Sequence, residues 1–145
     1  MRSFAILMFL LFQLNFSFAQ DSKKQIPAST DSTYGYSSAN PLKLKKGDLT
    51  KSIENSIAFL KGLKTQDGQS LDYYARSSIQ DPSYKEPIIK LSNRVTGAPI
   101  TGKGGILDKY IFVTSISKDT IRIFVDVYHK GDLKVPVGLK YEAIK

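Results

Sequence analysis

The sequence predicts an α+β domain in which one amphipathic helix packs on an antiparallel sheet of about five strands. The strongest observation is the run over residues 104–141, where a Gly-Gly pair precedes three strand-like segments. In the middle segment the β-branched residues Ile121, Ile123, Val125 and Val127 alternate with other side chains. Such alternation is typical of a half-buried strand. The second observation is one segment with helical periodicity, residues 50–64.

The first 19 residues have the pattern of a signal peptide. Met1-Arg2 gives a short positive start, residues 4–12 are apolar, and Ser17 and Ala19 put small residues at the cleavage site. The apolar run is too short to cross a bilayer core of about 30 Å. We therefore expect cleavage after Ala19 and export to the periplasm or the extracellular space. No transmembrane segment remains in the mature chain, and an uncleaved anchor is the alternative.

The mature chain predicted in this way is a single domain with a flexible leader. Cleavage leaves 126 of the 145 residues, enough for one modest hydrophobic core. Residues 20–33 are polar and aperiodic, which is typical of a leader, and residues 34–145 form the domain. Cysteine is absent, so the chain has neither a disulfide nor a thiol nucleophile.

The first elements of the domain are an edge strand and the helix. Leu42 and Leu44 alternate with lysines, a pattern that is common in strands at the edge of a sheet. Asp48 or Thr50 can cap the helix over residues 50–64 by accepting free backbone N–H groups. The face expected to pack on the sheet consists of Ile53, Ser56, Ile57, Leu60 and Leu63, with Phe59 on its flank. The residues expected on the solvent face are Lys51, Glu54, Asn55 and Lys61.

The remaining elements are strands. Residues 71–76 are a candidate strand, and residues 106–116 and 120–129 should pair as an antiparallel hairpin. Between them, residues 77–103 contain three prolines and a candidate short strand at 88–91, so this connection is either a binding loop or disordered. The last run, residues 133–141, contains Pro136 and is expected at an edge or beside a bulge.

The segment over residues 97–104 almost matches the phosphate-binding loop of nucleotide-binding proteins. Its eighth residue is Gly104, where the motif needs a hydroxyl that holds magnesium. A strand-like segment follows it, whereas the motif requires a helix whose N-terminus faces the phosphates. These glycines are better explained as a sharp entry into the sheet.

His129 is the one histidine of the chain and a candidate for acid–base chemistry; the remaining candidates for an acid–base pair are Asp72, Asp108 and Asp126. A zinc site would have to be built mostly from carboxylates, so we predict neither a metal nor a cofactor. Asp126 is close enough in sequence to orient His129, but no G-x-S-x-G nucleophile pattern occurs. An exposed structural histidine is therefore favoured. A small envelope hydrolase that uses His129 with Asp126 is the alternative.

Charge and tyrosine content favour a binding protein. The formal net charge is +8, and it falls to +7 when Arg2 is removed with the signal peptide. An exported basic protein meets anionic glycans and headgroups before it meets nucleic acid. Tyrosine rings stack on sugars, although they pack cores equally well. The candidate ligand-binding residues are Tyr34, Tyr36, Tyr110, Tyr128 and Lys109. The leading prediction is a non-catalytic envelope or secreted module that binds an anionic glycan or a protein partner.

Three segments together resemble a family of small exported bacterial proteins of unassigned function. They are Tyr34-Gly35-Tyr36-Ser37 with Asn40-Pro41-Leu42-Lys43, Ala58-Phe59-Leu60 with Gly68, and Gly104-Gly105-Ile106-Leu107-Asp108-Lys109-Tyr110 with Tyr128 and Pro136-Val137-Gly138-Leu139. The chain departs from the family pattern at Arg76-Ser77-Ser78, where similar proteins have Gly-Ser and then cysteine. The resemblance implies a shared fold and export.

Members of that family sometimes carry the name 2-dehydro-3-deoxyphosphooctonate aldolase. An enzyme of that activity is a (β/α)8 barrel, which needs about 200 residues or more and eight strand–helix repeats. A mature chain of 126 residues with one strong helix cannot build that barrel. The resemblance therefore implies no reaction.

Overall fold

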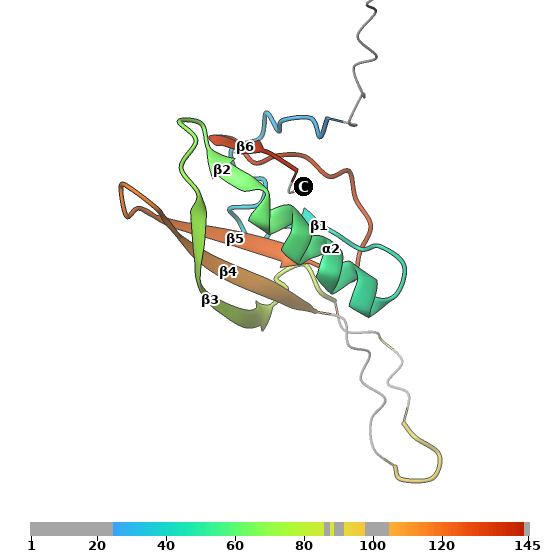
Figure 1. Ribbon diagram of the computed structural model, residues 1–145. Coiled ribbons are helices and arrows are strands. Elements are labelled where there is room, and N and C mark those ends of the chain that lie inside the picture. The colour runs from blue at the N-terminus through green and yellow to red at the C-terminus, as the bar shows by residue number, and fades with distance from the viewer. Residues whose placement is uncertain (1–24, 86–87, 89–91, 98–104, 144–145) are drawn as a thin grey trace, which may run out of the picture.

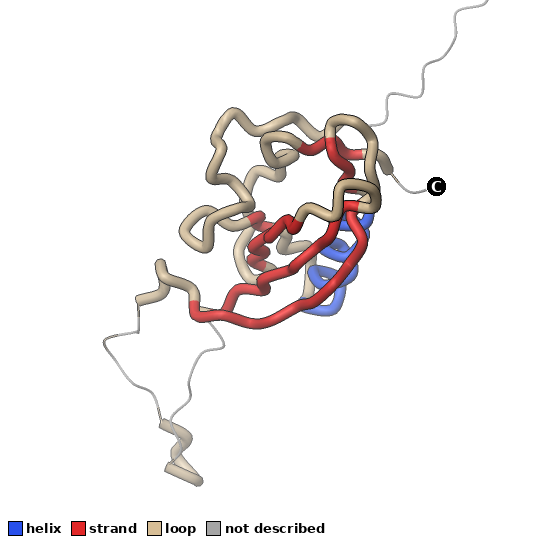
Figure 2. The backbone as a smooth tube through the Cα atoms, turned by 90° about the vertical axis from the view of Figure 1, so that its left-hand side faces the viewer, coloured by secondary structure: helices blue, strands red, loops and turns tan. Residues whose placement is uncertain are grey.

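The computed structural model describes residues 25–85, 88, 92–97 and 105–143 of the chain (Figure 1). The expected signal peptide, most of the expected strand at residues 88–91 and most of the loop at 97–104 lie outside these residues. The described residues form an α+β fold with one helix, as predicted. The helix α2, Leu49–Lys61, lies across one face of the main sheet (Figures 1 and 2).

The main sheet has four strands in the order β1-β5-β4-β3. Their bounds are Leu42–Lys43 for β1, Leu71–Gln80 for β3, Ile106–Thr114 for β4 and Thr120–Asp126 for β5. β4 and β5 form the predicted antiparallel hairpin, and β3 pairs with β4 antiparallel. The sheet is mixed because β1 pairs with β5 in parallel. The predicted edge strand at residue 42 is confirmed.

The final segment of the chain does not join the main sheet. Only Leu139–Tyr141 forms a strand, β6, and it pairs antiparallel with β2, Leu63–Thr65. Pro136 has no N–H to donate to a ladder, which explains why the expected strand over residues 133–141 is short. The two-stranded sheet of β2 and β6 lies beside one end of α2, as Figure 1 shows.

Residues that lie directly opposite each other on neighbouring strands point to the same face of a sheet. The register therefore assigns each side chain of the main sheet to one of two faces. The inner face packs toward α2 and carries the core residues Leu42, Tyr110, Phe112, Ile123 and Val125. The outer face carries the alternate residues Lys43, Lys109, Ile111, Arg122 and Phe124. α2 therefore covers one side of the sheet only.

The helix begins where the sequence predicts but presents a different face to the sheet. Asp48 is the N-cap, and its carboxylate accepts the N–H of Lys51 at 2.9 Å. Phe59 and Leu60 are buried as core residues, whereas Ile57 is 40 % exposed. The prediction that Ile57 packs on the sheet is wrong. Ser56 is buried as predicted, and Ser52, which was not expected on this face, is buried beside it. Both hydroxyls donate to backbone carbonyls.

Part of the expected leader is attached to the domain. The N–H of Ser29 donates to the carbonyl of Val135 at 2.8 Å, and the N–H of Val135 donates to Pro27 at 2.9 Å. The carboxylate of Asp31 accepts bonds from Thr33 and from Asn40, which fixes the following turn. These bonds hold the chain against the domain from Pro27 onward.

Candidate functional site

Two of the candidate tyrosines tie the N-terminal turn to the C-terminal loop. The Tyr34 hydroxyl donates to the carbonyl of Asp132 at 3.1 Å and accepts the N–H of Lys134 at 3.2 Å. The Tyr36 hydroxyl donates to the carbonyl of Val137 at 2.8 Å. Both rings pack against the core, and burial raises the pKa of both phenols. These two tyrosines have a structural role in the contacts that the structure describes.

The other two candidate tyrosines also pack inward. Tyr110 is 5 % exposed and stacks on Phe112 with ring centroids 6.2 Å apart. Burial raises the pKa of the Tyr110 phenol. Tyr128 is partly buried against the same core. The structure therefore does not gather the four candidate tyrosines with Lys109 into one patch, because Tyr110 and Lys109 alternate along β4 and point to opposite faces.

Lys109 belongs instead to a group on the outer face, which we call the basic outer face, made of three cations and one aromatic residue: Lys43, Lys109, Arg122 and Phe124. Lys109 lies directly opposite Phe124 on the neighbouring strand. Arg122 is two residues from Phe124 on β5, so it is a diagonal neighbour of Lys109 at about 7–8 Å. Lys43 and Arg122 are exposed, whereas Lys109 and Phe124 are half-buried. None of the three cations forms an ion pair within the described residues.

Sequence reasoning named Lys109 but missed its neighbours. The alternation along residues 120–127 does predict that Arg122 and the apolar residues of β5 point to different faces of that strand. It cannot show which residue of another strand lies beside Arg122, because that depends on the register of β4 and β1. Phe124 was missed because an aromatic residue in an apolar strand is usually taken as core.

His129 and Asp126 meet as the hydrolase alternative requires. The ring Nδ1 of His129 lies 2.7 Å from Oδ2 of Asp126. Asp126 is buried, and its other oxygen accepts the N–H groups of Tyr128 and His129 at 2.8 and 3.0 Å. The carboxylate thus closes the turn after β5. The His129 side chain is 61 % exposed, and its Nε2 has no hydrogen-bond partner within the described residues.

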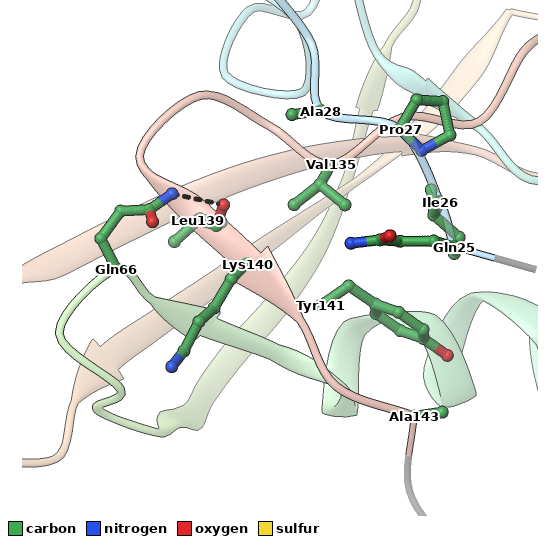
Figure 3. Close-up of a pocket in the computed structure, with 10 residues that line it drawn as sticks. All are labelled: Gln25, Ile26, Pro27, Ala28, Gln66, Val135, Leu139, Lys140, Tyr141 and Ala143. Atoms are coloured by element: carbon green, nitrogen blue, oxygen red, sulfur yellow. Dashed lines mark hydrogen bonds between the residues drawn. The ribbon is translucent and has the colours of Figure 1, made fainter. Parts of the chain in front are cut away.

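A cavity with a volume of about 670 Å³ lies between β6 and the N-terminal segment (Figure 3). Val135 and Tyr141 form apolar walls, and the side-chain amide of Gln66 crosses the rim to donate to the carbonyl of Leu139 at 2.8 Å. Gln25 and Ala143, which also line it, stand at the borders of the described residues. Lys140, which also lines it, forms an ion pair with Glu142 at 3.3 Å.

A second cavity, which we call the α2–β3 groove, has a volume of about 580 Å³. It is lined by Ile57, Leu60, Lys61, Leu71, Asp72, Tyr73, Arg76, Tyr110 and Phe112. Nη2 of Arg76 donates to the buried carboxylate of Asp108 at 2.8 Å, and the guanidinium lies 5.6 Å from the centre of the Tyr110 ring. The groove opens on the inner face of the sheet, opposite the basic outer face.

The described residues include no group of three acidic, histidine or cysteine side chains that could hold a metal ion. No helix among them is long and apolar enough to cross a membrane. Searches of protein-family models, of curated proteins and of solved structures find no match to this chain. The resemblance drawn from the sequence motifs therefore stays a prediction, and function must be argued from the geometry of the surfaces described above.

Proposed function

We propose that this protein is an exported, non-catalytic binding module of the envelope or the secreted fraction, and that its basic outer face binds an anionic glycan or an acidic protein partner. The observation that carries the proposal is the grouping of Lys43, Lys109 and Arg122 around Phe124, where none of the three cations makes an ion pair within the described residues. Asp126 lies opposite Lys43, but its carboxylate is buried and bonded to the ring of His129 and to two backbone N–H groups. The sheet face that they occupy is the one that α2 leaves uncovered.

Electrostatics explains why such a face favours an anion. Like charges about 7–8 Å apart repel one another, and a bound polyanion replaces that repulsion with attraction. The excess of basic residues over the whole chain, with a formal net charge of +8, adds a long-range attraction for acidic polymers. The half-buried ring of Phe124 offers an apolar surface on which a sugar ring can stack between charged contacts.

The hydrolase alternative has one observation in its favour, the contact between His129 and Asp126. One feature opposes it. The exposed ring of His129 has no nucleophile within hydrogen-bond reach among the described residues. A general base requires a positioned nucleophile as well as an orienting acid. The geometry therefore supports binding better than hydrolysis.

Retention on immobilised alginate, an acidic polysaccharide, tests the proposal. The wild-type protein should be retained at low salt and released as salt screens its charges over a Debye length of about 8 Å at physiological ionic strength. The double variant Lys109→Gln/Arg122→Gln should elute at clearly lower salt. The double variant Lys45→Gln/Lys51→Gln changes net charge equally but leaves the outer face intact, so it should elute close to wild type.

Two results would contradict the proposal. Equal shifts for both double variants would show that net charge alone, and no particular face, retains the protein. Release of soluble fragments from an isolated envelope fraction by the wild type, lost in His129→Ala, would favour the hydrolase.

A further inference from the structure

The α2–β3 groove exposes apolar surface that the fold itself does not cover. Its floor is formed by the rings of Tyr110 and Phe112, which are nearly parallel with an interplanar angle of 12°. Ile57 of α2 and Tyr73 of β3 line its sides, and they are 40 % and 63 % exposed. The volume of about 580 Å³ lies within the range of about 300–1,000 Å³ that is common for small-molecule sites.

The groove is lined by two cations, Arg76 and Lys61. Arg76 is held in place by Asp108, whose side chain is 7 % exposed. One guanidinium nitrogen makes that bond, and the Arg76 side chain is still 41 % exposed, so other N–H donors remain for a ligand. Lys61 also lines the groove and makes no ion pair within the described part of the chain. Asp72 borders the groove, but the register assigns its side chain to the outer face, opposite Val113.

We propose that the α2–β3 groove binds a small carboxylate with a flat apolar body. The planar guanidinium of Arg76 matches the two oxygens of a carboxylate, and Lys61 adds a second cation. The stacked floor of Tyr110 and Phe112 suits a flat body, and the Tyr73 ring stands nearly perpendicular to Phe112, at 74°, as a wall. This site lies on the inner face, so it is independent of the basic outer face and of the function proposed for it.

Calorimetric titration with 2-naphthoate and with the neutral 2-naphthylmethanol tests this inference. The wild-type protein should bind both probes and bind the carboxylate more tightly. Tyr73→Ala removes a wall and should weaken both, whereas Tyr74→Ala removes a neighbouring tyrosine that is 73 % exposed and does not line the groove, and should weaken neither. Lys61→Gln should weaken naphthoate about threefold to fivefold, the size of an exposed ion pair, and leave the alcohol unchanged. Lys51→Gln on the same helix is the matched control.

Several outcomes would overturn the inference. They are the absence of saturable naphthoate binding by the folded wild type, equal losses for Tyr73→Ala and Tyr74→Ala, and naphthoate-induced amide shifts that map to Lys109 and Arg122. The last result would place the anion on the basic outer face. If naphthoate fails to bind but an extended peptide protects the amides of β3 from hydrogen exchange, the occupant is an added strand and the small carboxylate is excluded.

Discussion

Truncation of two apolar residues on α2 distinguishes the observed helix face from the one expected from periodicity. Leu60 is 3 % exposed in the core, whereas Ile57 is 40 % exposed at the groove. Leu60→Ala removes about three methylene equivalents at about 0.8 kcal/mol each, or about 2.4 kcal/mol. A cavity term raises the total to about 2.5–3.5 kcal/mol; it is small because Leu60 borders the open groove, into which neighbouring side chains can relax.

Ile57→Ala removes the same number of carbons from a site that is already 40 % exposed. About 60 % of the transfer free energy is lost, or about 1.4 kcal/mol, and the better helix propensity of alanine returns about 0.4 kcal/mol. The expected net loss is therefore about 1 kcal/mol. Urea unfolding followed by circular dichroism, with an unchanged m-value, measures both changes. Equal losses in the two variants, or a larger loss for Ile57→Ala, would refute the helix orientation described above.

Two further predictions concern the buried tyrosines and the N-terminus. Burial raises the pKa of Tyr110 above its ordinary 10.0, so the unfolded chain loses this proton first as the pH rises. The neutral Tyr110 phenol therefore contributes to the free energy of unfolding fully below about pH 10, and this contribution is lost as the pH rises through the folded-state pKa. Because Tyr110→Phe has no phenol to ionise at this position, it should lose less stability than wild type between pH 9 and pH 11. Urea melts at each pH, with Tyr74→Phe as control, should show this difference, and parallel declines in Tyr110→Phe and wild type would exclude it. Separately, mass spectrometry of the exported protein should find Gln20 as its first residue, and a chain that begins at Met1 would disprove the predicted cleavage.

The sequence predicts most of the helix and strand positions but says little about which strands pair and which faces pack. Alternation along β5 and the turn at residues 117–120 predict the hairpin with β4, since both signals are local. The prediction that Ile57 of α2 packs on the sheet is wrong, because hydrophobicity alone ranks isoleucine above serine as a core residue. In the structure, the small buried residues Ser52 and Ser56 permit close contact between helix and domain, and this depends on the shape of the opposite surface.

The candidate site shows the same limit more strongly. Lys109 could be named from composition, but its neighbours Arg122 and Phe124 are fixed by a register that no single segment encodes. The sequence predicts Tyr73 and Arg76, which line the groove, only as part of a strand. Their contact with Asp108 and Phe112 requires the pairing of β3 with β4 across a connection of 25 residues, 81–105, whose sequence does not show which strands pair.

The pairing of distant strands has a consequence for the order in which the chain can fold. β1 pairs with β5, where Leu42 lies opposite Val125, and β2 pairs with β6, where Leu63 lies opposite Tyr141. Both pairings join the first half of the domain to its last residues, and such long-range closures slow folding. The core around Leu60 therefore cannot close on a growing chain until β5 and β6 have been synthesised. A chain held open in this way remains suitable for threading through a translocation channel, in keeping with the export proposed here.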